Sequence, residues 1–340
     1  MTSCSSDETT TKPLGPVAIE ALRAEFESAN CEWQVRCGGT PDKATCKIVD
    51  GADYPLVQLI ADAGKGKAKY DGQAGRTWVE AVRNQACEIG DAVQKALKAA
   101  WEPVFTGTVA AGKSCLLDDE CAGKSVCDKP GCGDTECCAG SCAPAPAPAA
   151  EGQPCDVTTA CPDGTFCGVE DGSGGTGNGG AGGGGTGMTI CKAKADNGQP
   201  CTDQVGCEDG QLCDVDGSHK CYKLSPDGQP CNPSLRFSCL SYDHWCDPAA
   251  GKCVELPGAG APCAPTGEYC KHFAVCDSGT CKARPLDGQP CGGPGTCLGD
   301  LRCDMNTSVC KTLSPAQACF GDGMPPTGSG SGGGGAGGGG

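Results

Sequence analysis

The chain has 340 residues, of which 33 are cysteine and 56 are glycine, while aromatic residues make up only 4%. This composition excludes a large conventional core, and it is typical of a disulfide scaffold formed in an oxidising compartment. The net charge of −16 arises mainly from residues 114–340, which hold 27 acidic and 13 basic side chains, so we expect no nucleic-acid binding.

Residues 1–15 have no apolar period and are predicted to be a flexible tether. They contain neither a basic n-region nor an apolar h-region, so no complete signal peptide is visible. The run from Met1 to Cys4, followed by serines and acidic residues, resembles the trimmed junction of a bacterial lipoprotein. This resemblance implies lipidation of Cys4; the alternative is an unmodified cysteine in the tether.

Residues 16–106 are predicted to form a small helical domain. Apolar residues recur at steps of three and four from Ile19 to Cys37, and again from Trp78 through Ala86 to Phe105 with a break near Gly90. A short apolar stretch at 56–60 predicts another helical piece. Three of the four tryptophans lie in this region, so it can bury a modest core. Its cysteines are even in number and could form two disulfides: Cys31, Cys37, Cys46 and Cys87.

Residues 107–142 are predicted to be an upstream unit with seven cysteines, followed by a stiff Pro/Ala linker at 143–150. The segment from Gly107 to Ser114 matches the phosphate-loop pattern letter for letter. Because Cys115 follows at once, where that motif requires a helix, we interpret the segment as a linker and expect no nucleotide. The seven cysteines are Cys115, Cys121, Cys127, Cys132, Cys137, Cys138 and Cys142.

Residues 151–319 contain tandem repeats, and the glycine-rich residues 320–340 are predicted to be a disordered tail. Gly-Gln-Pro-Cys, or Gly-Ala-Pro-Cys in one case, opens each repeat, and repeats after Cys201 begin 30, 32 and 28 residues apart. The five repeats are Cys155/Cys161/Cys167/Cys191, Cys201/Cys207/Cys213/Cys221, Cys231/Cys239/Cys246/Cys253, Cys263/Cys270/Cys276/Cys281 and Cys291/Cys297/Cys303/Cys310. The predicted fold class is therefore a small α-helical N-terminal domain followed by disulfide-rich loop and short β-hairpin repeats, with little regular secondary structure.

Disulfides must supply most of the stability of each repeat, because about 30 residues bury too little apolar surface to fold alone. Four cysteines allow three connectivities, and sequence does not choose among them. We expect the first to pair with the third and the second with the fourth, with a small hairpin before each fourth cysteine. Cys319 is left over. Its partner is either the odd cysteine of the upstream unit or a cysteine of another chain.

Two resemblances bear on cellular location. The pattern Cys115-Leu-Leu-Asp-Asp-Glu-Cys121 and the five cysteines after it resemble the N-terminal cysteine-rich domain of Dickkopf proteins. The Gly-Gln-Pro-Cys repeats resemble modules of secreted or lipid-anchored cysteine-rich proteins of myxobacteria and their relatives. These resemblances imply an extracellular or outer-envelope protein. Similarity of short cysteine patterns to whey-acidic-protein inhibitor domains supplies the alternative, a secreted inhibitor-like or signalling-antagonist-like protein.

Catalytic and metal-binding motifs are missing from the sequence. It contains no Cys-x-x-Cys, no His-Glu-x-x-His and no Gly-x-Ser-x-Gly, and its three histidines are isolated. The acidic run Asp214-x-Asp216-Gly217 is interpreted as a plain turn rather than a calcium loop. We therefore expect no enzymatic activity, no cofactor and no metal; an enzyme housed in the helical region is a third, less favoured reading.

Aromatic residues gather in the third repeat, where Arg236, Phe237, Tyr242 and Trp245 lie close together in sequence. Exposed aromatic and arginine side chains are the usual contact residues of binding surfaces. These four are predicted to bind an extracellular protein or polysaccharide, and the alternative is that the rings pack on disulfides as a miniature core. The predicted function is extracellular binding, adhesion or a stalk.

Overall fold

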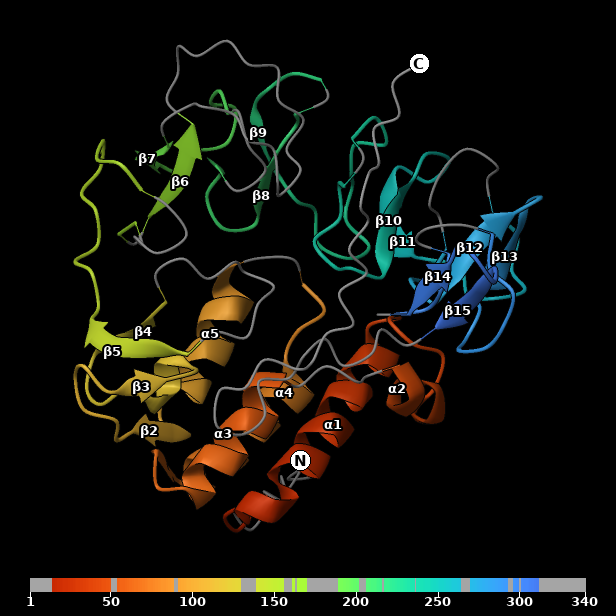
Figure 1. Ribbon diagram of the computed structural model, residues 1–340. Helices are drawn as coiled ribbons and strands as arrows, with labels where there is room; N and C mark the ends of the chain where they lie inside the picture. The colour runs from red at the N-terminus through yellow and green to blue at the C-terminus, as the bar shows by residue number, and fades with distance from the viewer. Residues whose placement is uncertain are drawn as a thin grey trace, which may run out of the picture.

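The N-terminal part of the computed structural model is a bundle of helices (Figure 1). The structure describes residues 14–49, 54–88, 91–129, 139–155, 161–162, 164–169, 189–201, 206–215, 217–235, 237–263, 270–292, 296–299 and 301–311. The helices are α1 (Ile19–Arg36), α2 (Lys43–Val49), α3 (Tyr54–Gly64), α4 (Gly72–Asn84) and α5 (Asp91–Trp101).

Local chemistry sets the helix ends. The α1 helix ends at Cys37 and Gly38, where the glycine takes a φ of 72° that ordinary residues avoid. Asp71 caps α4, since its carboxylate accepts the backbone N–H groups of Gln73 and Ala74 at 2.8 and 3.0 Å.

The predicted second helical run is partly wrong. Ala86 lies outside α4, which ends at Asn84, and Phe105 lies in a strand, β2 (Phe105–Gly107). The chain leaves the helix early because the Cys37–Cys87 disulfide and the Trp33 indole, which donates to the Ala86 carbonyl at 3.3 Å, hold residues 85–88 against α1. The α2 helix was not predicted because it shows no apolar period; the Cys31–Cys46 disulfide holds it against α1.

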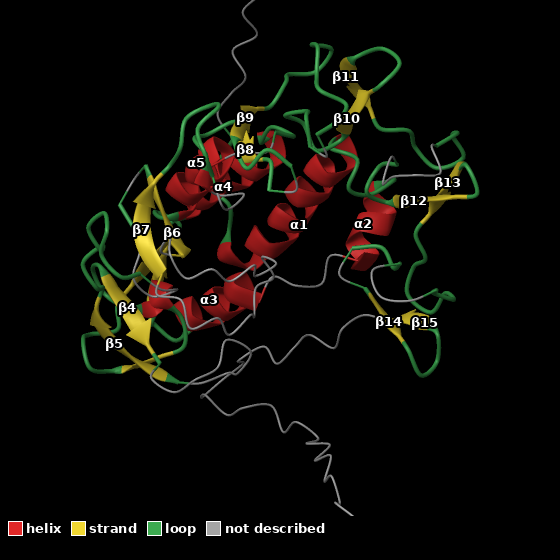
Figure 2. Ribbon diagram, turned by 90° about the horizontal axis from the view of Figure 1, so that it is seen from above, coloured by secondary structure: helices red, strands yellow, loops and turns green. Residues whose placement is uncertain are grey.

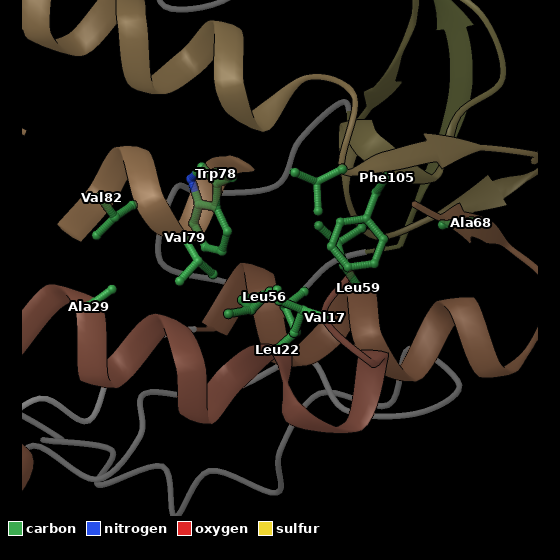
Figure 3. Close-up of a cluster of buried hydrophobic side chains, with 11 residues drawn as sticks. Val17, Leu22, Ala29, Leu56, Leu59, Ala68, Trp78, Val79, Val82 and Phe105 are labelled. Atoms are coloured by element: carbon green, nitrogen blue, oxygen red, sulfur yellow. The ribbon is translucent and has the colours of Figure 1, made fainter. Parts of the chain in front are cut away.

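The hydrophobic core lies between α1, α3, α4 and a short sheet (Figure 3). Trp78 of α4 is its centre, stacked on Phe26 with ring centroids 4.7 Å apart and meeting Trp101 edge-on at 4.6 Å. The sheet pairs β1 (Ala68–Tyr70) with β2 and closes one end of the core. The predicted domain boundary at residue 106 therefore falls inside β2.

The rest of the described chain consists of small antiparallel sheets, one in each cysteine unit. In the upstream unit they are β3 (Ser114–Cys115), β4 (Ser125–Asp128) and β5 (Gly140–Pro144), with a 3-10 turn η1 (Asp118–Glu120). The repeats contain β6 (Thr165–Val169) with β7 (Thr189–Ala193), β8 (Gln211–Cys213) with β9 (Cys221–Lys223), β10 (His244–Asp247) with β11 (Lys252–Glu255), β12 (Ala274–Asp277) with β13 (Thr280–Ala283), and β14 (Arg302–Asp304) with β15 (Val309–Lys311). The predicted fold class is confirmed. The predicted Pro/Ala linker, however, contributes its first two residues to β5.

The expected disulfide crossing is confirmed in all five repeats. First pairs with third and second with fourth: Cys155–Cys167 and Cys161–Cys191, Cys201–Cys213 and Cys207–Cys221, Cys231–Cys246 and Cys239–Cys253, Cys263–Cys276 and Cys270–Cys281, Cys291–Cys303 and Cys297–Cys310. The upstream unit has the same crossing, Cys115–Cys127 and Cys121–Cys142. It is therefore built like the repeats, with the segment that holds its three further cysteines inserted between the third and last crossing positions.

The backbone conformation explains why a glycine recurs at the start of each unit. It lies three residues before the first cysteine of each unit, at a φ between 72° and 88°, and its N–H donates to the carbonyl of the last crossing cysteine. Gly112 of the upstream unit is equivalent, and its N–H binds the Cys142 carbonyl at 2.7 Å. Only glycine takes this left-handed conformation without strain.

Gly260 provides a test of this conformational requirement. The φ of Gly260 is 88°, which an alanine adopts only with strain. The substitution Gly260→Ala should therefore lower the local stability of this repeat by about 1–2 kcal/mol, although a Cβ there would meet nothing within 4 Å. Native-state hydrogen exchange of the Cys281 amide, which binds the Ala261 carbonyl at 2.9 Å, measures the loss. Gly258→Ala is the matched control, because it also has open space but no positive φ. Equal exchange in both variants would contradict this account.

A second recurring contact joins each unit to the chain before it. The residue six positions before the first cysteine accepts a hydrogen bond from the residue after the second cysteine: Val109 from Ala122, Ala195 from Glu208, Ser225 from Leu240, Pro257 from Lys271 and Pro285 from Leu298, all at 2.9–3.1 Å. In the first repeat that donor is replaced by Pro162, which has no N–H. The exit strand of one unit is thus paired with the loop of the next.

The repeats curve back against the helical bundle. In Figures 1 and 2 the β10–β11 and β12–β13 hairpins lie beside the ends of α1 and α2. The Tyr242 N–H donates to the Cys87 carbonyl at 2.8 Å, and a Cβ at Gly38 would lie 3.2 Å from Lys271 Cδ. Within the described part of the chain, no helix has both the length and the apolar character needed to cross a membrane.

Candidate functional site

The structure places the three described residues of the predicted binding surface in different surroundings. Arg236 lies outside the described residues. The rings of Phe237 and Tyr242 are exposed, at 41% and 42%, whereas Trp245 is half-buried on β10 opposite Val254. Phe237 lines a groove, and neither Tyr242 nor Trp245 does.

This groove, called here the inter-repeat groove, lies between the second and third repeats and has a volume of about 620 Å³. One side is formed by the turn of the β8–β9 hairpin, and the other by residues 232–237. A smaller hollow of about 350 Å³ adjoins it, and Tyr222, Asn232 and Leu235 line both. The two hollows together form an extended depression across the junction.

Tyr222 occupies the middle of this depression. It follows the last cysteine of the second repeat on β9, and its hydroxyl donates to the Phe237 carbonyl at 2.8 Å. Burial raises the pKa of Tyr222 to about 12, with a further contribution from the Asp214 charge. The ring is thus fixed and protonated, and it ties the two repeats together.

Polar side chains of several kinds line the same groove. Asp214 Oδ2 accepts the Ser218 N–H at 2.7 Å, which holds the hairpin turn and lowers the pKa of this carboxyl. Asn232 Oδ1 accepts the Ser234 N–H at 3.0 Å. Lys220 adds an ammonium group. The groove therefore offers carboxylate, amide, hydroxyl and ammonium groups beside the exposed face of Phe237.

Tyr242 has a different environment at the contact with the helices. Besides the N–H bond to Cys87, its carbonyl lies 3.1 Å from His272 Nε2, and the two rings meet edge-on at 6.3 Å. His244, two residues further, pairs with Asp243 at 2.9 Å. Sequence proximity suggested one patch, but the backbone of Tyr242 is turned toward the helical bundle.

The cysteines form no thiolate site within the described residues. Crossing of two bridges brings three sulfur atoms of a unit within 4.8 Å of one another, as at Cys201, Cys207 and Cys221. That spacing resembles a metal cluster, but each of the 28 described cysteines is in a disulfide. Cys4, Cys132, Cys137, Cys138 and Cys319 lie outside the described residues, so the predictions about them stay predictions.

The phosphate-loop match has a structural explanation. Its Gly112 is the left-handed glycine of the upstream unit, the Lys113 carbonyl accepts the Cys142 N–H at 2.9 Å, and Ser114 is paired in β3. The N–H groups of Val109, Gly112 and Lys113, which would face a phosphate in such a loop, donate to the carbonyls of Glu120, Cys142 and Ala110 instead. The segment is the upstream counterpart of Gly-Gln-Pro-Cys.

Comparison with known proteins assigns no family: no protein-family model, no curated protein and no solved structure matches the chain. The resemblances to Dickkopf domains and to myxobacterial repeat proteins therefore stay expectations. Sequence reasoning also missed Tyr222 and Asn232. An aromatic residue directly after the last cysteine was the available signal, since the other repeats have Lys192, Val254, Lys282 and Lys311 there.

Proposed function

We propose that the protein is an exported, disulfide-stapled binding protein of the cell surface, anchored through a lipid on Cys4, and that the inter-repeat groove is its contact site. The observation that carries the proposal is the groove itself, whose volume of about 620 Å³ lies in the range of about 300–1,000 Å³ found for ligand sites. Because the repeats curve back on the helices, a compact binding role is favoured over a stalk.

The favoured partner is a polysaccharide. Sugar rings combine apolar C–H faces with many hydroxyl groups, so they match an exposed aromatic face surrounded by amide, hydroxyl and charged groups. Phe237 supplies the face, and Asp214 and Asn232 lie among the polar groups. The depression continues past Tyr222 into the second hollow, which suits a chain of rings better than a single small molecule.

The proposed role is binding without catalysis. Two groove residues have pKa values shifted away from neutrality. The pKa of Asp214 is lowered, and the pKa of Tyr222 is raised to about 12. A general acid or base works best with a pKa near the working pH, so neither group is suited to proton transfer near pH 7. This supports a groove that holds its ligand unchanged.

Removal of the exposed ring tests the proposal. Phe237→Ala should weaken binding at least about tenfold in a titration against an array of soluble envelope oligosaccharides, because aromatic contacts typically carry about 2 kcal/mol or more. Met305→Ala is the matched control, since Met305 is 66% exposed on another repeat and should bind like the parent. Tyr242→Ala and Trp245→Ala show whether the rest of the aromatic repeat takes part.

Two results would contradict this function. Unchanged oligosaccharide binding in Phe237→Ala would place the contact elsewhere. If the oxidised protein bound no sugar on the array but captured a defined envelope protein through Phe237, the partner would be a protein and the polysaccharide assignment would be wrong.

A further inference from the structure

Two carboxyl groups are buried together where the helical bundle meets the upstream unit. Asp62 of α3 and Glu120 of η1 are both 0% exposed. Glu120 directly precedes the second cysteine of the upstream unit, and its carbonyl accepts the N–H of Val109, in the chain that leaves the helical bundle, at 2.9 Å. Both carboxyl groups therefore lie at the joint between the two parts.

Each carboxyl group has one satisfied oxygen and one unsatisfied oxygen. Glu120 Oε2 accepts the Leu116 N–H at 3.2 Å and lies 3.4 Å from Lys67 Nζ. Asp62 Oδ2 accepts the Gln58 side-chain amide at 2.8 Å. Glu120 Oε1 and Asp62 Oδ1 have no donor among the described residues, and the two side chains are within hydrogen-bonding reach of each other.

One proton accounts for both unsatisfied atoms. Two ionised carboxylates in contact and out of water would repel each other, and each would keep an uncompensated acceptor. A single shared proton forms an O–H···O⁻ bond, which is among the strong hydrogen bonds of proteins. With Lys67 at 3.4 Å from Glu120, the protonated pair and the ammonium together carry no net charge.

We propose that Asp62 and Glu120 form a proton-dependent latch that holds the upstream cysteine unit against the helical bundle. With one shared proton the latch is closed. Loss of that proton leaves two like charges in a buried contact and loosens the joint.

The charged and buried surroundings of Glu120 support the latch and determine whether it opens at higher or at lower pH. Burial raises the pKa of Glu120, and the hydrogen-bonding and charge of Asp62 raise it further, so the proton is kept above the ordinary glutamate range. A raised folded-state pKa means that the stabilisation is fully present below the unfolded value of about 4.5 and is lost as pH rises through the folded value. The latch is therefore closed at lower pH and opens as the pH rises.

The other charged groups near the joint have separate partners. Burial also raises the pKa of Asp119, which accepts a hydrogen bond from Trp101, and Asp118 Oδ1 accepts the Cys127 N–H at 2.7 Å. Strand β2 contributes no titratable side chain, and Asp128 of β4 is exposed. Lys67 is thus the cation, and Asp62 the acid, that face Glu120 from the helical bundle.

The position before the second cysteine also distinguishes this joint from those between repeats. The equivalent residues in the five repeats are Ala160, Gly206, Ser238, Tyr269 and Thr296, none of which is a carboxylic acid. Backbone pairing is the same at Gly206 and Ser238, whose carbonyls accept the N–H groups of Ala195 and Ser225 at 2.8 Å. Among these six positions, the joint with the helices alone has a carboxyl side chain.

Hydrogen exchange on the full oxidised protein tests the latch. Between pH 5 and pH 8 the protection factors of the Leu116 and Val109 amides should fall about tenfold for each unit by which the folded pKa exceeds the unfolded one. Protection of the Cys281 amide in the fourth repeat should stay constant. In Glu120→Gln, whose amide can donate to Asp62 at every pH, the protection at the joint should no longer depend on pH.

Controls make each outcome decisive. Glu102→Gln, an exposed glutamate after α5, should keep the parent pH profile, and Asp62→Asn should flatten it as Glu120→Gln does. Constant protection at Leu116 and Val109 in the parent, or an unchanged pH slope in Asp62→Asn, would overturn the proposal. Should Glu120→Gln fail to fold, the parent profile and Asp62→Asn decide alone.

Discussion

Reduction of the disulfides is expected to abolish ordered structure in residues 114–311 while the helices between 19 and 101 keep part of their circular dichroism. Among the described residues of the second repeat, the hydrophobic cluster consists of its four cysteines, with Ala195 and Val215 packed against them. Bridges of this loop length contribute about 3 kcal/mol each by restricting the unfolded chain. Without them a repeat has almost no apolar core to replace that stabilisation.

The helical bundle has a core that does not depend on sulfur. Its buried cluster includes Leu22, Leu59, Val79 and Trp78, and the bundle contains two of the fourteen described disulfides. Far-ultraviolet circular dichroism before and after reduction, with exchange of the Cys221 and Cys281 amides, measures the two parts separately. Simultaneous loss of the helical signal and of the hairpin protection would show that the bundle does not stay folded without the disulfide-bonded repeats.

Trp78→Ala is expected to produce the largest loss from a single core substitution, about 3–5 kcal/mol of unfolding free energy. The ring is 8% exposed, stacks on Phe26 at an interplanar angle of 3° and meets Trp101 edge-on, so its removal leaves a cavity and breaks two aromatic contacts. Denaturant unfolding of the oxidised protein, followed by helical circular dichroism, gives the value.

Two variants calibrate that loss. Trp78→Phe keeps an aromatic ring and should cost clearly less than the alanine variant. Trp245→Ala removes a half-buried ring from a hairpin that two disulfides hold, and should leave the helical transition nearly unchanged. A change below about 1 kcal/mol for Trp78→Ala would mean that the cluster around this ring is not the core of the bundle.

Short-range features of the fold could be predicted from sequence because they depend on neighbours along the chain. The crossing of the cysteines was expected from the short turn before each last cysteine, although spacing alone leaves three connectivities open. In the structure most of the bridges in the repeats join residues only 11–15 positions apart. The bounds of α1 follow from its apolar period and Gly38. Where the pattern continued past the structural element, as at Ala86 and Phe105, a disulfide and a strand pairing overrode it.

The candidate site was predictable only in part. Phe237 was identified from the aromatic run, and its exposed face lines the inter-repeat groove. Tyr242 and Trp245 belong to the same run but lie in other surroundings, because Trp245 is paired with Val254 on β10 and the Tyr242 N–H, before that strand, binds the Cys87 carbonyl. Tyr222 comes from the preceding repeat, and no spacing within the third repeat could indicate it.

By itself, the sequence determined a helical domain followed by disulfide-rich hairpin repeats, because local periodicity, glycine conformation and short loops between cysteines act over a few residues. Tertiary structure alone decided which units touch. It paired β1 with β2 across more than thirty residues, brought Tyr242 to Cys87, and buried Glu120 against Asp62. Such contacts depend on how whole elements pack, and in each case the partner is set by burial and hydrogen-bond satisfaction rather than by distance along the chain.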